Sequence, residues 1–206
     1  MRSVGGGFSA LELDALRETG NVAAGGAATS LSGLLGRSVR LELPRVREVG
    51  PQDLEGSEIA GGEGAVVAFA VTGRVHGRVF LLADAASVKA LLGFLPLGGG
   101  GRAGEDSALK EIGNIICGAY LNALARWTGL TLLPSVPDLE WGPLRKAWDG
   151  GAVPLSDAGN LLIETRLRVA GVELTLVLLF TPGPGALEAL FDALARSTGV
   201  DPRGGG

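Results

Sequence analysis

The feature that most constrains this chain is an internal repeat. When the sequence of 206 residues is shifted by 93 positions against itself, residues 10–44 align with residues 103–137 without a gap. The 11 identical pairs among these 35 positions are Ala10/Ala103, Glu12/Glu105, Ala15/Ala108, Leu16/Leu109, Glu18/Glu111, Gly20/Gly113, Asn21/Asn114, Gly25/Gly118, Leu31/Leu124, Gly36/Gly129 and Pro44/Pro137. A repeated chain folds as similar units packed together, so we expect two pseudo-symmetric halves.

Each half has the same predicted order of elements. A long helix ends at Gly36 or Gly129, and a short strand, a variable connection, two strands and a final helix follow. The predicted ranges are 9–35, 39–43, 64–72, 74–83 and 85–94 in the first half, and 105–128, 131–133, 160–169, 172–180 and 185–197 in the second. A short amphipathic helix is expected around 144–148. We therefore predict an α/β (α+β) fold, with long helices packed on a mainly antiparallel sheet.

The glycine-rich segment Gly98–Gly104 divides the two halves. Glycine runs without large side chains are typical of flexible connections. We expect a first half at 8–97, a linker at 98–104 and a second half at 105–200, which together form one domain. Because both halves lie in one chain, an obligate dimer is unnecessary, and we expect a monomer.

Composition excludes several classes of function. The net charge is -4, which argues against binding to nucleic acid or an anionic membrane. The chain has 1 Cys and 1 His, too few for a zinc site of the usual kind. No apolar run reaches the length of a membrane span, and the first residues do not resemble a signal peptide. We expect a cytoplasmic protein without a metal or cofactor of its own.

Both long helices carry a polar stripe opposite their apolar face. Asp14, Glu18, Asn21 and Gly25 stack along one side of the first helix, and Ser107, Glu111, Asn114 and Gly118 repeat the pattern. A single stripe of this kind is typical of a solvated helix surface. Asn and Gly lower helix stability, however, by up to about 1 kcal/mol each relative to Ala. Their presence in both copies therefore indicates a function.

The glycines suggest two separate uses. Gly25 and Gly118 lie on the polar stripes, where the lack of a side chain lets another surface approach Asn21 or Asn114. Gly20 and Gly113 lie on the inner stripes, where we expect them to permit close packing between helix and sheet.

These motifs resemble a known family. Asp14-x-x-x-Glu18-x-x-Asn21 followed by Pro44, and Ser107-x-x-x-Glu111-x-x-Asn114 followed by Pro137, are similar to the signature of the CheC/CheX/FliY phosphatases of chemotaxis. Two copies in one chain resemble CheC more than CheX, which has one site per chain. At this length we expect no room for the extra domain that FliY carries.

The resemblance implies hydrolysis of the aspartyl phosphate on the response regulator CheY. Asn21 and Asn114 would orient the attacking water, and Glu18 and Glu111 would dock the regulator through its active-site Lys. The regulator would supply its own Mg²⁺. Asp14 and Ser107 are expected at helix starts or in auxiliary contacts, and Pro44 and Pro137 at strand ends or turns near the sheet.

Two further points stay open at the sequence level. A non-catalytic adaptor that holds phosphorylated CheY or CheD is the rival function. The family resemblance also implies CheD as a partner, docked on Trp141, Leu144, Trp148 and Asp149, although the same Trp residues are equally explained as a cover for the sheet edge. His76 and Cys117 are poor catalytic candidates, because Ala occupies the equivalent position in the other half.

Overall fold

An eight-stranded antiparallel sheet forms the centre of the protein in a computed structural model. The structure describes residues 10–42, 44–50, 62–96, 100–144 and 160–198. The elements of the first half are α1 (Ala10–Leu35), β1 (Val39–Leu41), β2 (Arg45–Val49), β3 (Glu63–Gly73), β4 (Gly77–Asp84) and α2 (Ala85–Gly93). Those of the second are α3 (Gly101–Thr128), β5 (Leu132–Pro134), β6 (Asp138–Pro143), β7 (Asn160–Val169), β8 (Val172–Pro182) and α5 (Ala186–Thr198). The predicted fold class is confirmed.

The two halves exchange their edge strands. The sheet order is β1-β7-β8-β4-β3-β5, with β2 also paired to β7 and β6 also paired to β3. The short strands of the first half therefore bond to the second half, and those of the second half to the first. The strands β4 and β8 pair with each other at the centre, from Gly77↔Pro182 to Ala83↔Leu176. Neither half completes its own sheet, because its short edge strands pair with strands of the other half.

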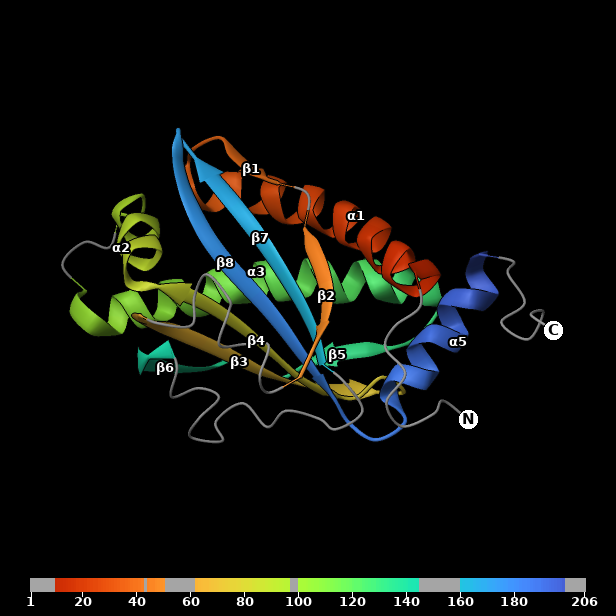
Figure 1. Cartoon of the computed structure of the whole chain (residues 1–206). Helices are drawn as coiled ribbons and strands as arrows, with labels where there is room; N and C mark the ends of the chain where they lie inside the picture. Colours follow the sequence, from red (N-terminus) through yellow and green to blue (C-terminus); the bar gives the residue numbers. More distant parts are fainter. Residues whose placement is uncertain (1–9, 43, 51–61, 97–99, 145–159, 199–206) are drawn as a thin grey trace.

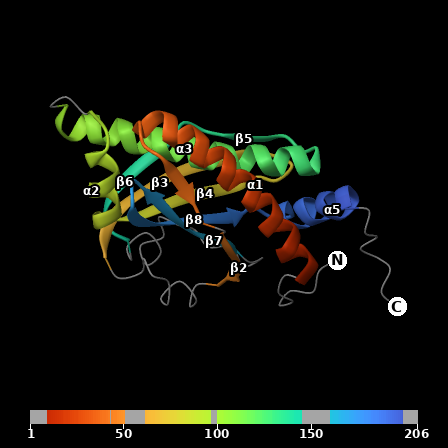
Figure 2. The same cartoon turned by 90° about the horizontal axis from the view of Figure 1, so that it is seen from above.

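The long helices α1 and α3 lie side by side across one face of this sheet and run in opposite directions (Figures 1 and 2). Both end where the sequence predicts, at glycines with positive φ: 60° at Gly36 and 68° at Gly129. The predicted start of α3 at residue 105 is wrong, since the helix begins at Gly101. Arg102 forms ion pairs with Glu105 at 3.9 Å and Asp106 at 3.6 Å, and these contacts support a first turn that glycine content alone disfavours.

The hairpin between β7 and β8 matches the prediction at both strand starts. Its turn residues are Ala170 with φ 48° and Gly171 with φ 88°, as a two-residue turn with left-handed backbone requires. The hairpin of the first half differs from the prediction, because β4 begins at Gly77 and not at residue 74. Residues 74–76 form the turn between β3 and β4.

The connection after β5 contains a strand, β6, that the sequence pattern did not predict. Trp141 lies in β6, which pairs with β3 from Glu63↔Pro143 to Ala68↔Asp138. Residues 145–159, which include most of the predicted helix, lie outside the described residues.

The core occupies both faces of the sheet. The larger cluster lies under the helices and includes Leu16, Leu31, Ile112 and Ile116. A smaller cluster on the opposite face consists of Val49, Phe80, Leu82, Leu144, Leu162, Val177 and Leu179. Because β4 and β8 are buried on both faces, their sequences are almost continuously apolar. None of the helices within the described residues has the length and apolar character of a membrane span.

Candidate functional site

Glu18 and Asn21 lie one turn apart on the side of α1 that faces away from the sheet. Glu18 is exposed and Asn21 is half-buried, whereas their neighbours Leu16, Thr19 and Gly20 are buried. The 3.6-residue period of the helix produces this separation, since the apolar stripe must face the sheet. The carboxylate and the carboxamide therefore point outward together, as the sequence predicts.

The second helix repeats this arrangement. Glu111 and Asn114 are both exposed on α3, and Ile112 and Gly113 between them are buried. Within the described residues, the four side chains of Glu18, Asn21, Glu111 and Asn114 form no hydrogen bond or ion pair. Their polar atoms are therefore available to another molecule.

Two glycines on the outer stripes face open space. A Cβ atom placed at Gly25 or at Gly118 would meet no other atom within 4 Å. Packing within the chain therefore does not require glycine at either position. The lack of a side chain instead leaves the helix backbone accessible beside each Asn.

The two glycines on the inner stripes have the opposite environment. A Cβ at Gly113 would lie 2.8 Å from Cγ1 of Val67 and 3.3 Å from Cζ of Phe69, both on β3. A Cβ at Gly20 would lie 2.9 Å from Cγ of Pro44. The expected close packing of helix on sheet is confirmed for Gly113. Gly20 instead packs on the connection between β1 and β2.

This contact explains the distant proline of the first motif. Pro44 is buried between β1 and β2 and rests on Gly20, the residue next to Asn21. Pro137 occupies the equivalent place between β5 and β6 and is also buried. Both prolines lie at strand ends, which confirms their predicted structural role. Pro44 therefore packs against α1 one residue before Asn21.

The auxiliary residues do not lie at helix starts. α1 begins at Ala10 and α3 at Gly101, so Asp14 and Ser107 are both beyond the first turn. Asp14 is 74% exposed and forms an ion pair of 3.9 Å with Arg17. The Ser107 hydroxyl donates to the carbonyl oxygen of Ala103 at 2.9 Å. Both lie on the same outer faces as the Glu and Asn residues, where an auxiliary contact remains open to them.

A groove of about 380 Å³ runs between α1 and α3 beside Asn114. Small residues of both helices lie along it, among them Ala23 and Gly26 of α1 and Gly118 and Ala119 of α3. Asn114, Asn122 and Arg126 supply its polar groups from α3. Asn122 and Arg126 were not among the predicted site residues, although their spacing of four residues continues the row of Asn114 and Gly118 along α3.

The proposed partner segment is only partly described. Trp141 donates from Nε1 to Oδ1 of Asp106 at 2.8 Å, and the Arg102 guanidinium stacks on its ring at 3.6 Å. Leu144 is 0% exposed and packs in the smaller core cluster, so it is no surface anchor. Trp148 and Asp149 lie outside the described residues. Trp141 thus fastens the sheet edge to α3, and the binding of CheD stays a prediction.

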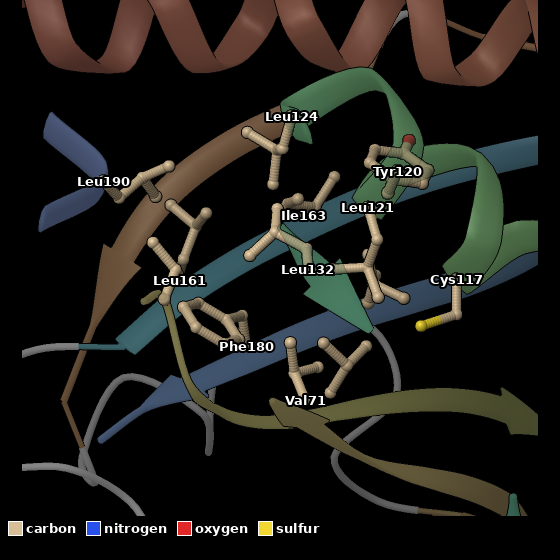
Figure 3. Close-up of a pocket in the computed structure, with 13 residues that line it drawn as sticks. Val71, Cys117, Tyr120, Leu121, Leu124, Leu132, Leu161, Ile163, Phe180 and Leu190 are labelled. Atoms are coloured by element: carbon tan, nitrogen blue, oxygen red, sulfur yellow. The ribbon is translucent and has the colours of Figure 1, made fainter. Parts of the chain in front are cut away.

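A small cavity of about 30 Å³ lies under α3 and is drawn in Figure 3. Its lining is apolar except for Cys117 and Tyr120. Burial raises the pKa of the Cys117 thiol to about 12. Burial also raises the pKa of Tyr120 to about 12, with Thr165 opposing part of this shift. The Tyr120 hydroxyl has no hydrogen-bond partner within the described residues. The Thr165 hydroxyl donates to the Glu42 carbonyl oxygen at 3.3 Å.

Neither of these groups suits hydrolysis at neutral pH. A thiol or phenol with so high a pKa remains protonated and is a weak nucleophile. His76 is exposed in the turn before β4, and its ring packs against Gly183. No cluster of three or more metal-binding side chains occurs in the described part of the chain. The exposed helix faces are therefore the strongest candidate site.

Comparisons with known proteins match the same helices. A model of the CheC-like family covers residues 11–47 and 105–140, which contain both motifs. The chain is 30% identical over 209 residues to the CheY-P phosphatase CheC of Bacillus subtilis (strain 168). That alignment spans 95% of this chain and 99% of the relative.

Solved structures share the fold. The crystal structure of Thermotoga maritima FliY matches with a TM-score of 0.73 and 22% identity, over 92% of this chain and 98% of that one. A chain in the CheX-CheY-BeF3-Mg²⁺ complex of Borrelia burgdorferi matches with a TM-score of 0.52 and 16% identity, over 78% and 95%. At these identities the likeness is one of fold.

Proposed function

The chain belongs to the CheC-like family, and we propose that it hydrolyses the aspartyl phosphate of a phosphorylated response regulator of the CheY type. The observation that carries the proposal is the repeated pair of outward-facing Glu and Asn side chains without partners in the described part of the chain. The relative from Bacillus subtilis is named a CheY-P phosphatase, which supports the same reaction.

The chemistry suits these residues. An acyl phosphate has a good leaving group, so hydrolysis needs a water held in line with the phosphorus more than it needs a strong nucleophile. The carboxamide oxygen of Asn21 or Asn114 accepts a hydrogen bond from that water and orients it. Because the amide is neutral, it approaches the phosphoryl oxygens without charge repulsion. Mg²⁺ belongs to the regulator in this proposal.

The glutamates fix the position of the regulator. Glu18 and Glu111 lie one turn before the Asn, on the same face and about 5–6 Å away. A regulator Lys that pairs with this carboxylate sets the phosphoryl group over the amide. Such a charge-assisted contact fixes register as well as affinity. The open positions at Gly25 and Gly118 leave room for the regulator backbone.

Release of inorganic phosphate from the phosphorylated regulator tests the proposal. Wild type should accelerate release, Asn21→Ala and Asn114→Ala should each lose one site, and the double variant should lose the acceleration. Asn→Asp at both positions keeps the size but adds negative charge, so it should be equally inactive. If the double Ala variant binds the regulator and accelerates release fully, water positioning by Asn is wrong.

The docking role needs a separate measurement. Affinity for a regulator loaded with a phosphate mimic should fall in Glu18→Lys/Glu111→Lys. Glu188→Lys, at an exposed position of α5, changes the charge as much as each single reversal and is the matched control for Glu18→Lys and for Glu111→Lys. Unchanged affinity after both reversals would refute docking by these carboxylates. Binding by wild type without any acceleration would favour the rival adaptor function.

A further inference from the structure

The two long helices differ beyond the shared motif. Four residues after Gly118 and Gly25 lie Asn122 on α3 and Thr29 on α1, and four residues further lie Arg126 and Gly33. The Thr29 hydroxyl donates to the carbonyl oxygen of Gly25 at 3.0 Å, so it is occupied within its own helix. Asn122 and Arg126 line the groove. The second site therefore continues into polar groups that the first site lacks.

Arg126 is an exposed cation that forms no ion pair within the described residues. It lies twelve residues beyond Asn114 on α3, about 18 Å along the helix axis, and both residues line the same groove. A free phosphate ion is far too short to bridge that distance. Glycine and alanine make up much of the groove's lining, with Val22 and Ile115 beside them, so the groove accepts a close protein surface.

We propose that Arg126 is a specificity determinant of the second site, and that it pairs with a carboxylate on the docked response regulator about 18 Å from its phosphoryl group. This inference rests on the proposed function. Positive charge at the rim of an interface raises the association rate and selects for a partner of opposite charge. The first site has Gly33 at the equivalent position and makes no such selection.

A structural explanation of Arg126 makes a different prediction. A basic side chain in the last turn of a helix also stabilises the helix dipole. Arg196 is likewise an exposed arginine in the last turn of α5, outside the groove, and so offers a matched control. Both reversals change the net charge equally, and both disturb a helix end.

The experiment isolates the second site in the Asn21→Ala background and measures phosphate release against regulator concentration. Arg126→Glu should raise KM by about fivefold at low salt, since an exposed ion pair contributes up to about 1 kcal/mol. This difference should shrink at 0.5 M salt, and kcat should stay nearly constant. Arg126→Lys should behave like the parent, and Arg196→Glu should leave KM unchanged.

The converse variant adds the missing cation to the first site. A Cβ at Gly33 meets nothing within 4 Å, and the position is exposed, so the helix has room for Gly33→Arg to begin its side chain there. In the Asn114→Ala background it should lower KM, whereas Gly33→Ala should not. An unchanged KM for Arg126→Glu, or an equal rise for Arg196→Glu, overturns the inference while the proposed function stands. If wild type releases no extra phosphate, the proposed function itself fails.

Discussion

Gly113 and Gly118 lie on the same helix, and replacing each by alanine should change the stability of the protein in opposite directions. At Gly118 the added methyl group enters open space. The substitution should therefore recover the helix propensity of alanine and stabilise the fold by up to about 1 kcal/mol. At Gly113 the same methyl lies 2.8 Å from Cγ1 of Val67.

The cost at Gly113 follows from its neighbours. Val67 is β-branched and buried in the central part of β3, so it cannot rotate away. Overpacking of this kind costs about 1–3 kcal/mol, which outweighs the gain in helix propensity of about 1 kcal/mol. Gly113→Ala should therefore destabilise the protein by about 1 kcal/mol. The two variants should differ by about 2 kcal/mol.

Thermal and urea unfolding measure this difference. For a chain of this size, about 2 kcal/mol corresponds to a difference of about 4–8 °C in Tm. The urea m-value should stay constant, because neither methyl group changes the surface exposed on unfolding. Equal shifts of the same sign at both positions would refute the assignment of separate roles to the two glycines.

Phosphatase activity provides a second test of the role of Gly118. Leucine there should also stabilise the helix, but its side chain would stand about 6 Å from that of Asn114, inside the footprint of a docked regulator. In the Asn21→Ala background, Gly118→Leu should therefore lose most of its phosphatase activity while its Tm rises. Full activity of this variant would contradict close approach of a partner at Gly118.

Three further predictions concern the core. Gly20→Ala and Pro44→Ala should each destabilise the protein. In a double-mutant cycle the double variant should lose about 1 kcal/mol less than the sum of the two single losses, because the new methyl group replaces part of the proline ring. Additive losses would contradict the contact between these residues. Leu144→Ala should cost about 2–5 kcal/mol in urea unfolding, since its side chain is fully buried, and unchanged stability would reopen a surface role. Burial raises the pKa of Cys117 from 9.0 to about 12, so between these pH values the folded state keeps the thiol proton while the unfolded state releases it. The free energy of unfolding should therefore fall as pH rises above about 9, and it should fall less steeply in Cys117→Ala. An identical slope in both proteins would exclude this thiol as a cause.

The candidate site was predictable from sequence because it depends on local geometry. The spacing of Glu18 and Asn21 places both on one helix face wherever the helix packs, and the apolar stripe determines which face is inside. The repeat shows the same Glu and Asn spacing a second time, at Glu111 and Asn114. The groove residues Asn122 and Arg126 follow the same spacing, but only the neighbouring α1 shows that their face borders a groove.

Pairing of the strands could not be predicted in the same way. Because the halves are similar, each edge strand has two matching partners, one in its own half and one in the other. The sequence pattern does not distinguish these two choices, because either pairing would form a similar ladder of backbone hydrogen bonds. Only the assembled structure pairs β1 and β2 with β7, and β5 and β6 with β3. The glycine-rich start of α3 and the strand at Trp141 also support each other through a contact between distant residues, because Trp141 donates a hydrogen bond to Asp106 of α3.

The sequence by itself therefore determined the repeat, the helices and the outward face that carries the Glu and Asn residues, because these follow from the period of a single helix. The tertiary structure decided the exchange of edge strands, the seat of Pro44 on Gly20 and the groove beside Asn114. Each of these joins residues distant in the chain, and their free energy comes from contacts that exist only after the two halves have packed together.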